Sequence, residues 1–158
     1  MADVVDPATR SRMMAGIRGK DTTPEILVRR GLFELGFRYR LHDKRLPGKP
    51  DIVLPRYRAA VFVHGCFWHY HGCALSKLPA TRRRWWKAKL ERNRRKDLES
   101  VEALLEAGWR VLTIWECSFR RRRAEVGVPV IARTARWIRA GKATLELPAD
   151  PKPPVTPA

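Results

Sequence analysis

The chain has the length and composition of one folded domain. Its 158 residues are close to the size of a single domain, and 44% hydrophobic with 31% charged residues excludes a disordered or collagen-like protein. No apolar run reaches the ~18 residues that a membrane span needs, and no secretory signal pattern opens the chain. We therefore expect a cytoplasmic protein, with one domain over residues 1–147 and a flexible Pro-rich tail over residues 148–158.

Positive charge is the strongest signal in the composition. Lysine and arginine number 33 against 16 acidic residues, which gives a net charge of +17. Charge of this sign and size favours a polyanionic partner, nucleic acid before an anionic membrane or an acidic protein. The chain also has three cysteines, which a cytosolic protein keeps reduced. Their role as metal ligands is therefore the next question.

The N-terminal region predicts two short helices. The first should run from Asp6 to about Gly19. The second should begin near Thr22, where a capping box pairs Thr22 with Glu25, and should stop at Gly36.

Three strands and an irregular loop are predicted next. Alternating apolar and polar residues over 37–42 predict a half-buried strand, with the apolar side formed by Phe37, Tyr39 and Leu41 and the other by Arg38, Arg40 and His42. Apolar runs at 51–54 and 59–63 predict a hairpin of two central strands, joined by the turn residues 55–58. Residues 64–79 have no periodicity and form a candidate functional loop.

The second half of the chain predicts a long helix, a buried strand and a last helix. Residues 81–107 fit a helix whose final turns bury one face, made of Leu98, Val101, Leu104 and Leu105. Residues 109–115 predict a strand, and residues 128–140 predict a helix. This order of elements implies an α/β fold with a mixed sheet flanked by helices.

Cysteine and histidine residues cluster in the candidate functional loop. One imidazole and three thiols form a usual shell for structural zinc, and the chain offers such a set in Cys66, His71, Cys73 and the distant Cys117. Two alternatives stay open at this point. Three histidines of the loop would instead make a catalytic metal site, and each cysteine, Cys117 above all, would serve as a small buried apolar residue.

Asp51 is a candidate ligand for a catalytic cation. It follows a proline and opens a strand that is paired with a second strand, where many nucleases hold Mg²⁺ with carboxylates and a lysine. The second strand, at 61–63, has neither, so Asp51 would be the only direct side-chain ligand from this pair. The plainer interpretation is an aspartate in a Pro/Gly turn.

Several uncommon motifs occur together in this chain. The most distinctive is the run Phe62-Val63-His64-Gly65-Cys66-Phe67-Trp68-His69-Tyr70-His71-Gly72-Cys73, and others are Leu46-Pro47-Gly48-Lys49-Pro50-Asp51, Pro79-Ala80-Thr81-Arg82 and Trp115-Glu116-Cys117. Through them the chain resembles, over about residues 1–120, the very-short-patch mismatch repair endonucleases (Vsr). The resemblance implies a restriction-endonuclease-like fold. It also implies an enzyme that nicks one DNA strand 5′ to the T of a T:G mismatch, the product of 5-methylcytosine deamination.

The resemblance assigns roles to residues of the candidate loop and its neighbours. By position, Asp51 resembles the Mg²⁺ ligand, and the backbone carbonyl of Val63 resembles a second contact to that metal. His69 matches the general base or water-positioning group, and His64 matches a second active-site imidazole. A neutral imidazole, which titrates near pH ~6.5, is able to take a proton from an attacking water. The chemistry therefore needs no lysine.

Further matches concern supporting acids and zinc. Glu25 and Asp97 match acids that support the active site of the family. The structural zinc shell of the family is matched by Cys66, His71, Cys73 and Cys117. This assignment leaves His69 free for chemistry.

Aromatic residues are predicted to contact DNA. Rings that intercalate beside the mismatch in the family are matched by Phe67, Trp68 and Trp86, and such wedges unstack a base step at a cost of a few kcal/mol. Lys89 and Asn93 match positions that read the mismatched bases. The remaining large rings are expected in the core, namely Trp85, Trp109, Trp115 and Trp137.

Basic residues are predicted to hold the phosphates. Nine basic and two acidic residues lie between Arg82 and Asp97, Arg83 among them, which is too uneven for helix salt bridges. Met14, on the first predicted helix, would either press into the opposite groove or pack against the protein. Both assignments stay open.

Two other functions fit parts of the sequence. A zinc-stabilised DNA-binding module without catalysis would have no use for Asp51 together with His69, and an RNA-binding or ribosome-associated protein is supported by charge alone. The first choice of partner is double-stranded DNA with a T:G mismatch, with mismatch-repair proteins as further candidates. A nickase on an asymmetric mismatch has no need of two-fold symmetry, so we expect a monomer.

Overall fold

The computed structural model describes residues 21–119 and 128–148. The predicted first helix with Met14 and nearly all of the predicted tail lie outside these residues. Within the described part, no helix is both long and apolar enough to cross a membrane.

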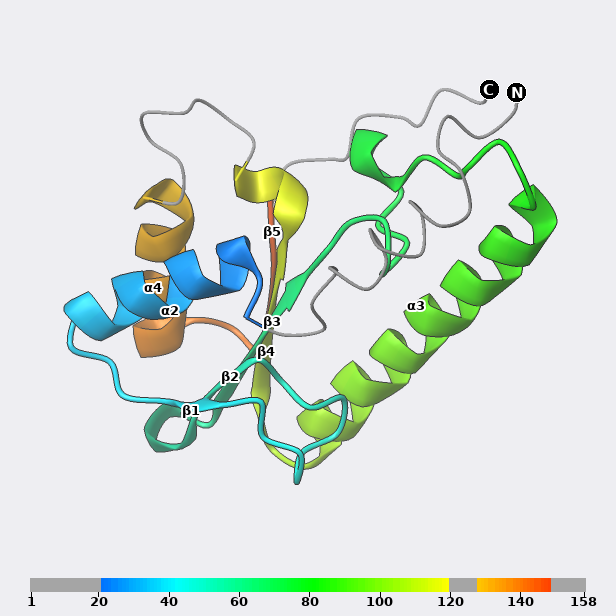
Figure 1. Cartoon of the computed structure of the whole chain (residues 1–158). Helices are drawn as coiled ribbons and strands as arrows, with labels where there is room; N and C mark the ends of the chain where they lie inside the picture. The colour runs from blue at the N-terminus through cyan, green and yellow to red at the C-terminus, as the bar shows by residue number, and fades with distance from the viewer. Residues whose placement is uncertain (1–20, 120–127, 149–158) are drawn as a thin grey trace.

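A mixed five-stranded sheet forms the centre of the protein (Figure 1). Its strands follow chain order and are β1 (Arg40–Leu41), β2 (Ile52–Leu54), β3 (Ala59–His64), β4 (Arg110–Trp115) and β5 (Thr144–Leu147). Strands β1, β2 and β3 pair antiparallel, whereas β3, β4 and β5 pair parallel. The predicted mixed α/β sheet is confirmed. Strand β5 was not predicted, because the only apolar residues among its four are Leu145 and Leu147.

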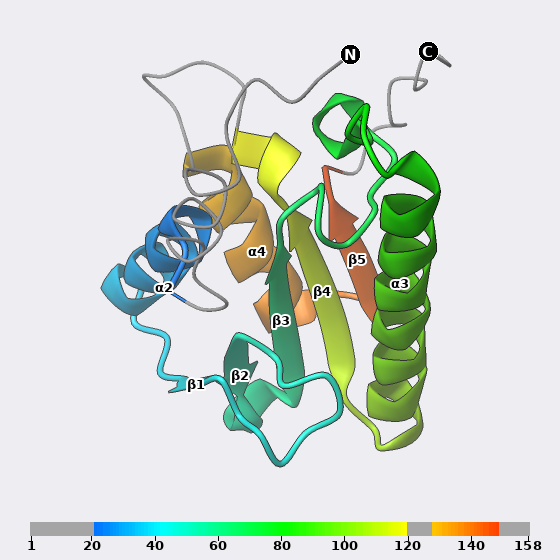
Figure 2. The same cartoon turned by 45° about the vertical axis from the view of Figure 1, so that its right-hand side comes forward.

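Helices cover both faces of the sheet (Figures 1 and 2). Helices α2 (Thr23–Glu34) and α4 (Val128–Ala140) lie on one face, and the long helix α3 (Arg83–Glu106) lies on the other. Successive side chains of a strand point to opposite faces of the sheet, so the core is divided into one cluster on each face. Ala59 and Val61 of β3 pack in the larger core cluster with α2 and α4, whereas Ala60 and Phe62 pack with Leu104 of α3. These three helices confirm the predicted ranges to within two residues.

The hairpin of β2 and β3 confirms the predicted turn. A 3₁₀ turn, η1 (Pro55–Tyr57), leads to Arg58, whose φ of 48° is left-handed and reverses the chain. The guanidinium of Arg58 donates to the carbonyl oxygens of Ala107, at 2.8 Å, and of Gly108, at 3.3 Å. The hairpin is therefore attached to the end of α3.

The start of α2 departs from the predicted capping box. Thr22 is the N-cap, and its hydroxyl accepts from the backbone N–H of Glu25 at 3.4 Å. The carboxylate of Glu25 accepts instead from the backbone N–H of Asp21, at 3.0 Å. Glu25 is buried although it is an acid in the first helical turn, so its charge needs partners inside the protein.

Three predicted burial positions are wrong. Leu41 is exposed because β1 is a two-residue edge strand with no layer over it. Leu98 is 57% exposed and lines an open cavity beside Thr113 and Glu146 of the sheet. Trp85 is 42% exposed on the first turn of α3, while Trp115 and Trp137 lie in the core as expected.

Candidate active site and metal cluster

The carboxyl ends of β3 and β4 bring the candidate site residues together. His64, the last residue of β3, pairs with Trp115, the last residue of β4, and the chain reaches a cysteine two residues after each. Asp51 stands at the start of β2, the other neighbour of β3. The two candidate metal sites therefore lie at the same end of the sheet, where β3 and β4 end and β2 begins.

Asp51 is a buried carboxylate with one backbone donor. Its Oδ2 atom accepts from the N–H of Val63 at 2.7 Å. Burial, with a smaller contribution from the nearby charge of Glu25, raises the pKa of Asp51 to about 6 against the opposing effect of the Val63 hydrogen bond. The protein therefore supplies too little hydrogen bonding and positive charge to stabilise the ionised carboxylate. A carboxylate oxygen in this state is a suitable ligand for a hard divalent cation.

His64 and His69 form a stacked pair of imidazoles beside Asp51. Their ring centroids are 3.7 Å apart and their planes differ by 3°. His64 is buried between Phe62 and Trp115, and burial lowers its pKa well below the ordinary value, so this ring is neutral near pH 7. The pair occupies the face of the sheet that α3 covers.

A carboxylate of α3 orients His69. The Nδ1 atom of His69 lies 2.6 Å from Oδ2 of Asp97. Because a carboxylate only accepts, Nδ1 carries a proton and Nε2 is the nitrogen available for proton transfer. The structure thus brings Asp97 into contact with His69, and its predicted role as a supporting acid stays a prediction.

One cavity of about 430 Å³ joins these groups. Its lining includes the predicted residues Asp51, Val63, His64, His69 and Asp97. It also includes three polar residues that sequence reasoning did not assign to the site, His42, Lys44 and Lys49. The cavity therefore combines two carboxylates, imidazoles and positive charge, a set of groups suited to a phosphate and a cation.

Glu25 lies behind His42 and outside the lining of this cavity. The Nε2 atom of His42 is 2.9 Å from Glu25 Oε1, and its Nδ1 is 3.8 Å from Asp51 Oδ1. His42 therefore stands between two carboxylates. The signal that could have found it is the antiparallel register, since Leu41 pairs with Ile52 and the next pair outward is His42 with Asp51.

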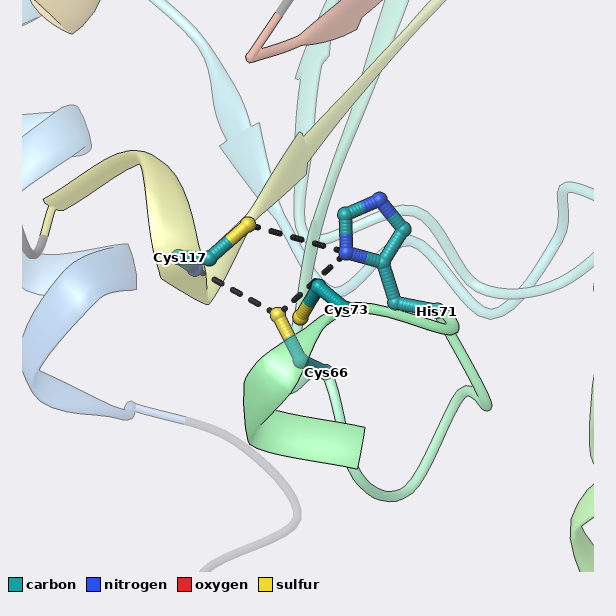
Figure 3. Close-up of side chains that lie close together, drawn as sticks. All are labelled: Cys66, His71, Cys73 and Cys117. Carbon is teal, nitrogen blue, oxygen red and sulfur yellow. Dashed lines mark hydrogen bonds between the residues drawn. The ribbon is translucent and has the colours of Figure 1, made fainter. Parts of the chain in front are cut away.

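The four predicted zinc ligands converge in a second cluster (Figure 3). The Nδ1 atom of His71 is 3.6 Å from the sulfur of Cys66 and 3.6 Å from that of Cys117, and the fourth ligand atom is the sulfur of Cys73. Burial raises the pKa of the Cys66 and Cys117 thiols, so a cation is needed to favour the thiolates. One nitrogen and three sulfurs within reach of one another fit a tetrahedral metal site.

Backbone and side-chain contacts hold the cluster in shape. The ring of His71 stacks on Trp115 at 4.0 Å. Ser76, which follows in the 3₁₀ turn η2 (Ala74–Ser76), donates to the carbonyl oxygen of Cys66 at 2.9 Å and accepts from the N–H of Gly72 at 3.0 Å. Ser76 is a structural residue that the sequence did not single out, since serine is common in loops.

The predicted DNA-contacting rings form one aromatic group at the start of α3. Phe67 lies 5.1 Å from Trp68 and 5.5 Å from Trp86, measured between ring centroids, and Trp85 lies 4.9 Å from Trp86. The ammonium of Lys89 lies within 5.9 Å of three of these rings. Such contacts are favourable cation–π interactions.

Asn93 and the basic residues continue this surface along α3. The Nδ2 atom of Asn93 donates to the carbonyl oxygen of Trp68 at 3.1 Å, so the helix is tied to the aromatic loop. The first turn carries the exposed Arg82 and Arg83, and the guanidinium of Arg82 lies 4.6 Å from the centre of the Trp85 ring. Aromatic and basic groups therefore share one exposed surface.

Known proteins resemble this chain over most of its length. The family model described as DNA mismatch endonuclease Vsr matches residues 2–75. DNA mismatch endonuclease Vsr of Escherichia coli (strain K12) is 44% identical over 138 residues, which are 87% of this chain and 88% of that protein. Type II nicking enzyme V.XorIIP of Xanthomonas oryzae pv. oryzae is 48% identical over 117 residues, 74% of this chain and 86% of the relative. By these similarities the chain belongs to the family of the DNA mismatch endonuclease Vsr.

Proposed function

We propose that this protein is a DNA mismatch endonuclease that nicks one strand 5′ to the T of a T:G mismatch and so starts very-short-patch repair. The observation that carries the proposal is the cavity in which Asp51, His64, His69 and Asp97 meet. The relatives support it, since one is named a mismatch endonuclease and others are named nicking enzymes. We further propose that the mixed sheet is a restriction-endonuclease-like fold and that the protein acts as a monomer in the cytoplasm.

Asp51 and the backbone carbonyl of Val63 would hold a catalytic Mg²⁺. Both residues line the cavity, and oxygen ligands are the kind that Mg²⁺ prefers. When bound, the cation would screen the charge of the scissile phosphate and stabilise charge that develops on it. Lys44 and Lys49 in the same lining would add favourable charge for a phosphate.

His69 would accept the proton of the attacking water, and His64 would support His69 in this role. Nε2 of His69 accepts that proton, while Asp97 on Nδ1 keeps the ring in the required tautomer. His64 is neutral and stacks on His69. It therefore limits the rotation of the His69 ring and adds no charge to the site. Proton transfer to a positioned imidazole contributes roughly 10²- to 10⁴-fold to such reactions.

The Cys/His cluster would hold a structural zinc ion. All four ligand positions are filled by protein groups, so no open position is left for a substrate. Zinc there would connect the ends of β3 and β4 with the loop that carries His69. The site is therefore proposed to support the active site without taking part in the reaction.

The aromatic group would open the mismatch and the basic surface would grip the backbone. Phe67, Trp68 and Trp86 would stack on bases, and a mismatch is the cheaper step to open. Lys89 and Asn93 would contact the mismatched bases. Because the Asn93 amide uses one N–H on Trp68, its oxygen and its second N–H are left for base contact.

Asp51→Ala tests the proposed activity. We expect the variant to bind a T:G duplex about as well as the wild type and to lose Mg²⁺-dependent nicking, because the proposed ligand of the cation is gone. Labelled T:G and T:A duplexes, incubated with both proteins with and without Mg²⁺, measure this directly. Tight mismatch binding by the wild type without any nicking would favour the non-catalytic DNA-binding module instead.

A further inference from the structure

We propose that His42 is a nitrogen ligand of the divalent cation that Asp51 holds, an inference that rests on the proposed function. The Nδ1 atom of His42 and the Oδ1 atom of Asp51 lie 3.8 Å apart in the lining of the same cavity. This distance is too long for a hydrogen bond. Two ligand atoms that each lie about 2.1 Å from a cation are separated by at most roughly 4.2 Å, so one cation is able to contact both.

The backbone fixes His42 opposite Asp51. The N–H of His42 donates to the carbonyl oxygen of Asp51 at 3.1 Å, as the next rung of the β1–β2 ladder. His42 has a φ of 49°, a left-handed conformation that costs a residue with a Cβ about 1 kcal/mol or more. Opposed residues of an antiparallel pair point to the same face of the sheet, so this pairing places the side chain of His42, just after β1, beside that of Asp51.

The other ring nitrogen of His42 faces acceptors only. Nε2 lies 2.9 Å from Glu25 Oε1 and 3.4 Å from Asp21 Oδ1. Carboxylates cannot donate, so Nε2 bears a hydrogen, and the neutral ring keeps its lone pair on Nδ1. A histidine that binds a metal usually donates its second N–H to a carboxylate, which fixes the tautomer and the ring orientation. Asp21 supplies such an acceptor here, and Glu25 places a second carboxylate within ion-pair distance of Nε2.

The cluster of Asp21, Glu25 and His42 is a less suitable cation site by itself. The guanidinium of Arg29 lies 2.7 Å from Asp21 Oδ1 and 3.6 Å from Glu25 Oε1, so a positive charge already faces these oxygens. On the opposite side of the ring, Asp51 Oδ1 faces Nδ1 inside the cavity. The charge balance therefore favours a cation between His42 and Asp51.

A nitrogen ligand changes which metals the site prefers. Mg²⁺ demands oxygen ligands, whereas first-row transition cations accept imidazole readily. We therefore infer that this chain binds Mn²⁺ more tightly, relative to Mg²⁺, than the same site would without His42.

Metal titrations of the full, zinc-loaded chain without DNA test this inference. The probes are Mn²⁺ alone, followed through the EPR signal of the free ion, and Mg²⁺ in competition with it. We expect His42→Gln to weaken Mn²⁺ binding by about 10- to 100-fold and Mg²⁺ binding by much less. The ¹⁴N coupling of a directly bound imidazole, seen by pulsed EPR in the wild type, should disappear in His42→Gln.

Control variants separate ligation from a general effect. Lys44→Gln changes another polar residue of the cavity lining and should keep the ¹⁴N coupling. Glu25→Gln keeps His42 but removes a negative charge beside its Nε2 atom, and should weaken Mn²⁺ binding by less than His42→Gln does. The second variant also keeps the test open if His42→Gln does not fold, which a melting curve shows.

Two results would overturn the inference. One is an unchanged Mn²⁺ to Mg²⁺ affinity ratio with retained ¹⁴N coupling in His42→Gln, and the other is a coupling that only His69→Gln removes. Failure of the proposed function looks different. In that case no T:G duplex is nicked with either metal, although the ¹⁴N coupling depends on His42 as expected.

Discussion

The burial of the Asp51 carboxyl group costs the protein stability. Burial raises its pKa from 3.8 to about 6, so between these values the folded state binds more protons than the unfolded state and stability falls as pH rises. Above about pH 6 this shift lowers the free energy of unfolding by roughly 3 kcal/mol. Asp51→Asn should therefore be more stable than the wild type at neutral pH without Mg²⁺. Urea unfolding of the zinc-loaded proteins at several pH values measures the difference.

The sign of this pH dependence makes the prediction specific. The advantage of Asp51→Asn should shrink as pH falls below about 6 and disappear near the unfolded pKa, about 4. Glu91→Gln, an exposed position on α3, is the matched control and should give no such advantage. A wild type at least as stable as Asp51→Asn throughout this range would contradict the assigned burial cost.

The contact between Asp97 and His69 predicts an effect on the rate of the chemical step. Asp97→Asn keeps the shape of the side chain but loses the charge that holds the Nδ1 proton of His69. We expect kcat for T:G nicking to fall about 10- to 100-fold with little change in KM, since Asp97 orients a group that acts in the transition state. Single-turnover nicking at saturating enzyme measures this. An effect confined to KM would instead place Asp97 among the DNA contacts.

At the scale of single residues, the sequence predicted the acids and imidazoles but not their partner His42. Asp51, His64, His69 and Asp97 stand in recognisable motifs or at matching positions, and the structure brings them to one cavity. His42 follows an apolar–polar alternation that places it on the exposed side of a strand. Its real orientation depends on a left-handed backbone and on the partner strand, and neither is encoded in local periodicity.

The metal cluster predicts a large loss of stability when one ligand is removed. Cys73→Ala leaves three of the four ligands, and because structural zinc binding contributes directly to folding, we expect a loss of several kcal/mol. Metal analysis should find about one zinc per wild-type chain and much less in the variant. A metal-free protein that melts at the temperature of the isolated protein would contradict a structural zinc.

The stability of the fold should also depend on the last strand, β5. Leu147 on β5 is 1% exposed and packs in the larger core cluster. Leu147→Ala should therefore cost about 2 to 5 kcal/mol of unfolding free energy. Leu98→Ala, at the exposed position on α3, is the control and should change stability by less than about 0.5 kcal/mol. Equal effects of the two substitutions in urea unfolding would contradict the role given to β5.

At the scale of elements, long patterns predicted more than short ones. Strands β3 and β4 and helices α2, α3 and α4 have continuous apolar runs or clear periodicity, and each was predicted nearly at its bounds. Strand β1 spans two residues and β5 four, and both are held by pairing with a neighbour more than by their own composition. Such edge strands carry too few residues for a pattern to form.

Aromatic and basic residues of the surface should contribute to DNA binding in two different ways. Trp68→Ala should cost about 1 to 3 kcal/mol of stacking and lower the preference for a mismatched duplex over a paired one. Arg83→Ala should weaken both duplexes alike and reduce the salt dependence by about one unit of log K per log salt. Titrations of both duplexes at several salt concentrations compare the two. An unchanged mismatch preference in Trp68→Ala would assign this ring to packing alone.

The position of the Cys/His cluster has a consequence for how such proteins diversify. Its contact between Cys66 and Cys117 joins residues 51 positions apart, and the chain between them holds the aromatic group and all of α3. Residues 67–109 of this stretch lie between Cys66 of the cluster and β4, so they are held at both ends, and their exposed surface is free to change while the sheet stays the same. We therefore expect residues 67–109 to be exchangeable between relatives as a cassette. A chimera should fold, bind one zinc and adopt the DNA preference of the donor of its cassette.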